Sequence, residues 1–248
     1  MDPNRPVLST FREQERLSYP LCKKRVAARF LISLLKKIAP GADSHQVIKT
    51  KLAHGNKILV VDHNFFKLSQ QEKIEASLGF DGMVTSVSDA TLFLSGADCP
   101  PVAFFDPING VIGLVHSGWR GTVARISSEC VKMMQRNFGT EAKHLVVSVG
   151  PSIAKNEFEV GGDVFTAFKN NGYAEDDLKK YFWPISLQKW LLDLPLVIKD
   201  QVIEAGVLAK NIECSSFTTS GNSNVFASAR VSGGVEKIDS NFFLLSLV

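Results

Sequence analysis

The stretch 96-GADCPPVAFFDPINGVIGLVHSGWRGT-122 holds two short apolar runs separated by turn residues. The runs, PVAFFD and GVIGLVH, are rich in β-branched and aromatic residues, which is typical of strands. The Asp, Pro, Asn and Gly residues between them are typical of a turn. The thiol of Cys99 stands just before the first run, and the imidazole of His116 ends the second. This stretch predicts two strands that carry chemically reactive side chains at their ends.

Further strand-like runs lie on both sides of this stretch. KILVVD at 57–62, GMVTSV at 82–87 and ATLFLSG at 90–96 precede or open it, and HLVVSVG at 144–150 follows. Several of these strands follow one another without a crossover, while others alternate with helical segments. The order favours an α/β (α+β) fold with a layered mixed β-sheet core and flanking helices.

Apolar periodicity and end signals predict the helices. Apolar residues recur at helical spacing across 25–38 and across 122–138. Ser69 and Glu72 form a capping-box pattern, which predicts a short helix that ends near Leu78.

The second half of the chain carries longer predicted elements. Residues 150–172 are expected to pass through a turn into a helix, and 186–205 to form a long helix interrupted at Pro195. The tail, 224–248, reads as two strands with a turn at Gly233-Gly234.

Composition is that of an ordinary globular protein. The 248 residues are 45% hydrophobic and 21% charged, and they contain no repeat, low-complexity tract or linker, which predicts a single domain. The net charge of +3 comes from interspersed acidic and basic residues, so no nucleic-acid or membrane surface is expected.

Localisation is predicted from apolar segments and cysteine usage. The first sixteen residues contain no apolar stretch of signal-peptide length, and no run reaches transmembrane length. The four cysteines are scattered and form no CxxC pair: Cys22, Cys99, Cys130 and Cys214. This usage fits a reducing compartment, so we expect a cytoplasmic protein.

Three ligand-type residues stand at turns beside predicted strands. Cys99 precedes two prolines that hold it in an extended turn, His116 ends a strand, and His54 precedes a glycine and a short strand. Two imidazoles and one thiolate can hold zinc and leave the fourth position for water. Bound zinc would bring the pKa of that water towards neutrality. The alternative is that Cys99 is a buried structural cysteine and His116 a satisfied hydrogen-bonding group.

Two charged residues beside this trio are further candidates. In HSGWRGT the glycines leave backbone amides uncrowded, Thr122 is expected to cap the following helix, and Arg120 adds a fixed charge. This turn is therefore a candidate anion site. Asp98 precedes Cys99 and is a candidate for orienting it or transferring a proton, or else simply caps the turn.

Four motifs carry a resemblance to a known family: DCPPV, HSGWRGT, VGPSIAKNEFEVGGDV and FDGMVT. They resemble the laccase-domain, or YfiH-like, family once labelled polyphenol oxidases, whose members are regarded as purine nucleoside phosphorylases and adenosine deaminases. The resemblance implies a catalytic domain over 46–248, with 1–45 as a divergent segment of the same domain. It also implies a layered mixed sheet similar to the catalytic domain of cytotoxic-necrotising toxins, which are cysteine hydrolases.

The resemblance also implies the roles of the site residues. His54, Cys99 and His116 match the family's zinc-binding positions, and Arg120 matches part of the same turn. The chain departs from the family pattern at Leu52, where glutamine is common, and in the loop at 152–154. A late motif appears as 228-SARVSG-233, which lacks one arginine and one aspartate but keeps Arg230 as a second candidate for binding phosphate.

The sequence therefore predicts a zinc-dependent enzyme that acts on small purine nucleosides. Phosphorolysis of adenosine, inosine or guanosine would use Arg120 to hold phosphate, and deamination of adenosine is a further possible activity. Five histidines are too few for the four coppers of a multicopper oxidase, so copper is not expected. Two alternatives stay open: a cysteine hydrolase or deamidase with Cys99 as nucleophile and His116 as base, and a catalytically degenerate binding protein.

Overall fold

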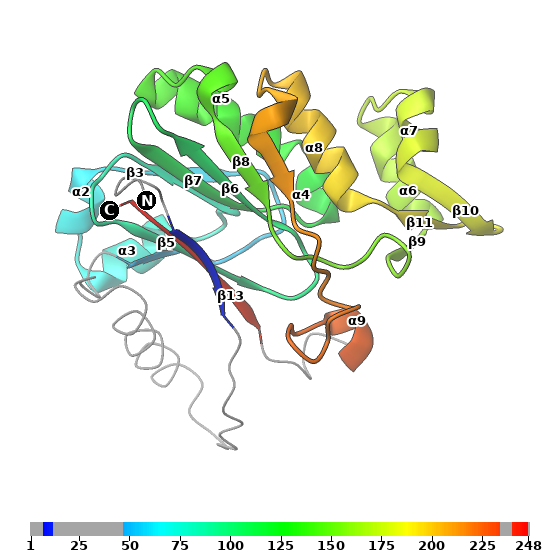
Figure 1. Cartoon of the computed structure of the whole chain (residues 1–248). Coiled ribbons are helices and arrows are strands. Elements are labelled where there is room, and N and C mark those ends of the chain that lie inside the picture. Colours follow the sequence, from blue (N-terminus) through cyan, green and yellow to red (C-terminus); the bar gives the residue numbers. More distant parts are fainter. Residues whose placement is uncertain (1–6, 12–46, 234–239, 248) are drawn as a thin grey trace, which may run out of the picture.

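The computed structural model describes residues 7–11, 47–233 and 240–247. The core is a mixed six-stranded sheet in the order β12-β8-β6-β7-β4-β3, shown in Figure 1. Its strands are β3 (Ile58–Val61), β4 (Gly82–Thr85), β6 (Pro101–Asp106), β7 (Val111–His116), β8 (Val146–Val149) and β12 (Ile212–Cys214). β3 runs parallel to β4 and β12 parallel to β8, while the pairs between β4, β7, β6 and β8 are antiparallel. The predicted mixed sheet is confirmed.

A four-stranded sheet packs on one face of the six-stranded sheet. Its order is β1-β13-β5-β2, with bounds β1 (Val7–Phe11), β2 (Val47–Lys49), β5 (Thr91–Gly96) and β13 (Asn241–Ser246). Strand periodicity explains the layering, because alternate side chains of β7 point to opposite faces. Ile112 and Leu114 join the core between the two sheets, whereas Val111 and Val115 face the helices.

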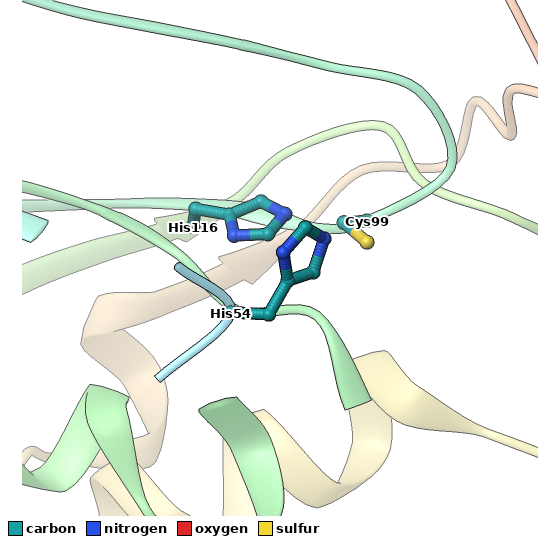
Figure 2. A group of neighbouring side chains, drawn as sticks. All are labelled: His54, Cys99 and His116. Carbon is teal, nitrogen blue, oxygen red and sulfur yellow. The ribbon is translucent and has the colours of Figure 1, made fainter. Parts of the chain in front are cut away.

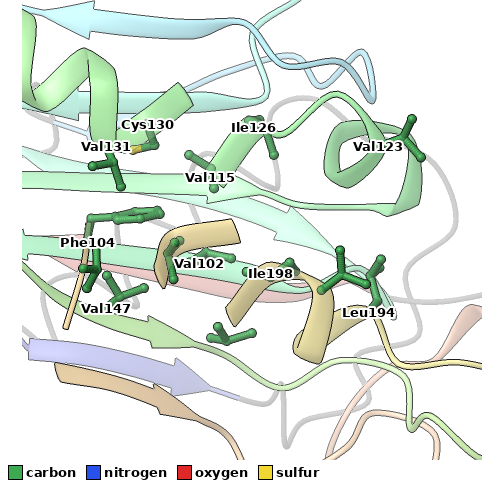
Figure 3. Packing of buried hydrophobic residues seen from close by; sticks show 14 of the residues in the cluster. Val102, Phe104, Val115, Val123, Ile126, Cys130, Val131, Val147, Leu194 and Ile198 are labelled. Carbon is green, nitrogen blue, oxygen red and sulfur yellow. The ribbon is translucent and has the colours of Figure 1, made fainter. Parts of the chain in front are cut away.

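Helices cover the opposite face. α5 (Ile126–Phe138) and α8 (Leu194–Glu204) bury apolar side chains against β6, β7 and β8, and Figure 3 shows Phe104 and Val147 in this packing. The chain also has shorter helices elsewhere: α2 (His63–Lys67), α3 (Gln70–Ala76), α4 (Trp119–Val123), α9 (Ala229–Ser232) and 3-10 turns at Ala142–His144 and Ala209–Asn211. In α3 the Ser69–Glu72 capping box is present as predicted.

A third sheet projects beyond the end of α8. It has the order β10-β11-β9 and is flanked by two helices: β9 (Glu159–Gly161), α6 (Gly162–Asn170), α7 (Glu175–Tyr181), β10 (Phe182–Ser186) and β11 (Lys189–Leu192). The predicted long helix over 186–205 is therefore wrong in its first half. Asp193 caps α8, and Pro195 lies in its first turn, where a proline has no hydrogen bond to lose.

Two other predictions need correction. The helix over 122–138 is interrupted by Arg125, whose φ of 57° is left-handed, so α4 and α5 are separate. The described part of the tail, 224–233 and 240–247, has one strand, β13, because 221–225 is a turn and α9 replaces the first expected strand; Gly233 ends α9 with φ 74°. The helix expected over 25–38 lies outside the described residues. In the part of the chain that is described, no helix combines the length and apolarity needed to cross a membrane.

Candidate metal centre

The three ligand-type residues meet at one edge of the six-stranded sheet. His116 is the last residue of β7 and pairs with Pro101, the first residue of β6, so Cys99 lies beside it just ahead of that strand. β4 starts opposite the same end of β7, and the backbone N–H of His116 donates to the carbonyl oxygen of Asp81 at 2.7 Å. His54 reaches this edge from the loop before β3, as Figure 2 shows.

The donor atoms of His54, Cys99 and His116 lie within 4.8 Å of one another. The two imidazole rings are 4.9 Å apart between centroids and meet edge to face. Ligand atoms on one tetrahedral zinc lie about 3.3–3.8 Å apart, so they need to close by at most about 1.5 Å, which side-chain rotation provides. His116 is buried, Cys99 half-buried and His54 exposed, which leaves an approach from solvent. The donor set fits a zinc ion with one open position.

Asp81 holds both histidines. Its side chain is fully buried, and its carboxylate accepts hydrogen bonds from the backbone N–H groups of Ala53, His54 and Gly55 at 3.2, 2.8 and 2.7 Å. The same carboxylate lies 3.2 Å from Nδ1 of His116. A proton on Nδ1 bonds to Asp81 and leaves Nε2 available as a ligand. Asp81 thus sets the tautomer of one histidine and the backbone of the other.

Two glycines make room for the centre. A Cβ atom on Gly118 would lie 2.9 Å from Sγ of Cys99 and 3.4 Å from Cε1 of His116. A Cβ atom on Gly121 would lie 2.8 Å from the carbonyl oxygen of Gly55, so α4 touches the loop that carries His54. Both glycines are required by close approach.

The electrostatics differ between the two histidines. Burial lowers the pKa of His116, but its hydrogen bonds to Asp81 and Cys99 outweigh burial and raise that pKa to about 9. Burial and the neighbouring charges of His116 and Arg120 lower the pKa of His54, with Asp81 opposing them. Burial raises the pKa of the Asp81 carboxyl, and the hydrogen bonds from His116 and the backbone overcome it and lower the pKa. A metal must therefore displace a proton from His116, whereas His54 is ready to bind.

Arg120 lies in α4, next to the centre. Its side chain is exposed, and its guanidinium carbon lies 4.2 Å from the ring centroid of Trp119. Its positive charge helps to lower the pKa of His54. The expected cap at Thr122 is wrong, because the helix starts at Trp119 and the Thr122 hydroxyl donates backwards to carbonyl oxygens of the preceding turn. The anion site predicted here therefore rests on the guanidinium.

Asp98 and Arg230 lie together on the other side of Cys99. The carboxylate of Asp98 accepts from the Thr219 hydroxyl and from the backbone N–H of Arg230, the latter at 2.8 Å. The Arg230 guanidinium donates to the carbonyl oxygen of Glu159 at 3.0 Å. Within the described residues, no hydrogen bond joins the Asp98 carboxylate to the three ligand residues. Asp98 thus ties α9 to the cysteine loop.

His54, Cys99 and His116, which the sequence pointed to as metal ligands, meet in the structure, but Asp81 was not among the predicted site residues. The residue stands inside the quoted motif FDGMVT, directly before a strand. Asp81 precedes β4, and His116 ends β7. The sequence does not show that these two strands are neighbours, so it does not show that the carboxylate lies beside the histidine. His63 begins α2 and His144 lies in a 3-10 turn, both outside the trio.

The fold and the site define a mixed α/β protein with a three-residue His/Cys/His centre at a sheet edge. The family model described as "Multi-copper polyphenol oxidoreductase laccase" matches residues 31–236, and the chain belongs to this family. The several coppers that this description names would need more ligands than the centre offers, which is three ligand residues among those described.

Similar proteins carry two activity names. The chain is 33% identical over 182 residues to a "Purine nucleoside phosphorylase" of Bacteroides thetaiotaomicron, covering 71% of this chain and 65% of that protein. It is 31% identical over 190 residues to "Adenosine deaminase RL5" from an unknown prokaryotic organism, covering 77% of this chain and 71% of that protein. The crystal structure of Bacillus licheniformis hypothetical protein YfiH matches with a TM-score of 0.79 at 27% identity, covering 89% of this chain and 82% of that one. The YfiH-like fold is thereby confirmed.

Proposed function

We propose that the chain is a zinc-dependent purine nucleoside enzyme that cleaves adenosine, inosine or guanosine with phosphate, with deamination of adenosine as a second activity. The observation that carries the proposal is the convergence of His54, Cys99 and His116 at one sheet edge with room for a fourth ligand. The activity names of the two relatives support the substrate class. Small molecules are the partners that we propose, and the cytoplasm the location.

Each residue of the site has a proposed role. Zinc, when bound, would supply a Lewis acid and an activated water. Asp81 keeps His116 in the tautomer that presents Nε2. The exposed guanidinium of Arg120 presents paired donors for a phosphate oxygen pair, and Arg230 is a second cation for the same anion. Asp98 orients the loop that carries Cys99.

One set of measurements tests the proposal. Protein purified without added metal is expected to contain about one zinc per chain. It should release adenine from adenosine only when phosphate is present, and any inosine formed without phosphate reports deamination. A zinc content far below one per chain, stoichiometric copper, or the absence of both products would refute it.

A cysteine hydrolase is the second candidate, favoured by one specific observation. Cys99 bonds to His116, whose other ring nitrogen lies 3.2 Å from the Asp81 carboxylate, which is the order of nucleophile, base and orienting acid. The two candidates differ in the reactivity of the thiol. A zinc-bound thiolate is protected, so Cys99 should alkylate slowly until a chelator is added. Fast alkylation of Cys99 with zinc still bound would favour the hydrolase.

A further inference from the structure

A cleft of about 350 Å³ lies between α3 and the edge of β2 that pairs with no further strand among the described residues. One end of it is closed where Lys51 and Leu78 pair as an isolated bridge, with the Lys51 N–H donating to the carbonyl oxygen of Ser77 at 3.2 Å. None of the residues that line it belongs to the metal centre. The cleft is therefore a separate feature of the molecule.

The cleft is lined by three lysines: Lys49, Lys51 and Lys73. Two of their ammonium groups lie over aromatic rings, Lys49 at 5.3 Å from the centroid of Phe93 and Lys73 at 5.9 Å from that of Phe66. An aromatic ring attracts a cation without neutralising its charge. No ion pair involves any of the three lysines among the residues that the structure places. The cleft therefore carries uncompensated positive charge.

The acidic residues of α3 have other partners. The Glu72 carboxylate accepts from the backbone N–H of Ser69 at 2.8 Å, and the Glu75 carboxylate accepts from the Gln71 side chain at 2.7 Å. These contacts run along α3 itself and leave the lysines of the cleft unpaired.

A buried hydroxyl points to the kind of ligand. Thr50 lines the cleft, is only 4% exposed, and its Oγ1 atom has no hydrogen-bond partner among the described residues. A buried hydroxyl without a partner is destabilising, and native proteins satisfy nearly all such groups. A hydroxyl donor in a cleft that is also lined by three lysines is suited to an acceptor with several negatively charged oxygens.

The remaining lining is apolar. Ile74 and Leu78 are 47% and 48% exposed, although both are large aliphatic residues, and the buried Phe65 also lines the cleft. A bare inorganic anion would leave this wall uncovered. An anion that carries an apolar or aromatic body would bury it.

We propose that this cleft binds a small organic phosphate, a monoester whose phosphate meets the Thr50 hydroxyl and the Lys51 and Lys73 ammonium groups. A phosphate monoester carries a charge of about −1.5 to −2 at neutral pH and presents three acceptor oxygens, which suits several lysines and one hydroxyl. Its apolar body lies along Ile74 and Leu78. The site is additional to the metal centre and does not depend on the activity proposed for that centre.

Phenyl phosphate is a suitable probe for calorimetric titration of the full, zinc-loaded chain. We expect one molecule of phenyl phosphate bound per cleft. Inorganic phosphate, which lacks the apolar body, and phenol, which lacks the phosphate, should each bind at least about tenfold more weakly. No detectable binding of phenyl phosphate to the wild-type chain would overturn the proposal.

Variants separate this cleft from the metal centre. Thr50→Val keeps the side-chain shape and removes the orphan hydroxyl, so the fold should be kept while phenyl phosphate binds about tenfold more weakly. The double variant Lys51→Gln/Lys73→Gln should weaken binding by a similar factor. Lys210→Gln removes one lysine charge away from the cleft, in the 3-10 turn at Ala209–Asn211, and should bind like wild type.

Arg120→Ala decides which site is occupied. It should leave the phenyl phosphate affinity unchanged, since Arg120 lies at the metal centre. Loss of binding in Arg120→Ala together with wild-type binding in Thr50→Val would assign the phosphate to the metal centre and overturn the proposal.

Discussion

Replacing Asp81 by asparagine should weaken zinc binding more than it disturbs the fold. One carboxylate oxygen accepts from the His54 N–H and lies next to Nδ1 of His116, and the other accepts from the Ala53 and Gly55 N–H groups. In Asp81→Asn one of these oxygens becomes an NH₂ group. Whichever way the amide turns, its NH₂ group, which is a donor, faces two of the N–H donors that the carboxylate accepted from.

The magnitude follows from those two lost contacts. Hydrogen bonds to a charged group contribute about 1.5–3 kcal/mol each, and removing a buried charge recovers part of that loss. We therefore expect the free energy of unfolding of the metal-free protein to fall by about 2–4 kcal/mol. If the amide NH₂ turns towards His116, it also favours a proton on Nε2, the atom needed for the metal. Changes in such supporting partners typically cost about 10- to 100-fold in metal affinity.

The assay is a competition between the protein and a zinc chelator, with urea unfolding of the metal-free protein in parallel. Asp106→Asn is the matched control. Asp106 is also a fully buried carboxylate that accepts from two backbone N–H groups, but it lies at the opposite end of β6. It should lose stability and keep zinc affinity. Zinc affinity in Asp81→Asn within twofold of wild type would refute the assignment of Asp81 as the residue that positions both histidines.

Three further predictions follow from the same geometry. Arg120→Ala should weaken apparent phosphate binding by roughly 10- to 150-fold with zinc retained, and Arg120→Lys should recover only part; unchanged phosphate dependence in a folded, zinc-replete protein would remove Arg120 from the site. Gly118→Ala places a methyl group 2.9 Å from Cys99 Sγ and should lower zinc affinity measured by chelator competition, whereas Gly96→Ala, whose Cβ would be 4.0 Å from the His116 ring, should not. Burial raises the pKa of Tyr173 to about 12, so unfolding releases a proton between pH 10 and 12, and stability should fall there by up to about 1.4 kcal/mol per pH unit. Urea unfolding of Tyr173→Phe should show a shallower fall over that range, and equal slopes would contradict the assignment.

Local patterns predicted the strands well because each strand is short and apolar. The run at 101–106 forms β6 with the expected bounds, the run at 110–116 forms β7 from Val111 onward, and Pro101 pairs with His116. Because the reactive residues flank these strands directly, the predicted trio meets in the structure. For residues that adjoin a strand end, a prediction of the strand is nearly a prediction of which side chains lie together.

The failures occurred where tertiary contacts override local preference. Arg125 takes a left-handed conformation inside an otherwise helical pattern. Its guanidinium carbon lies 4.5 Å from the Tyr173 ring centroid, and its Nη1 donates a hydrogen bond to the Glu204 carboxylate. Neither partner is close in sequence. Residues 182–192 form strands because they complete the small sheet against β9, a partner that periodicity does not reveal.

The structure also explains why three ligands from separate segments need little reorganisation to bind a metal. His116 is held by β6 and β4 on either side, Cys99 precedes the rigid Pro100–Pro101 step, and the His54 loop is tied by three N–H groups to Asp81. Each anchor exists without the ion, and the Asp81–His116 contact uses Nδ1 and leaves Nε2 of His116 for the metal. The fold therefore holds the three side chains in place in advance, and a metal that bound there would mainly have to displace the proton that the buried His116 retains.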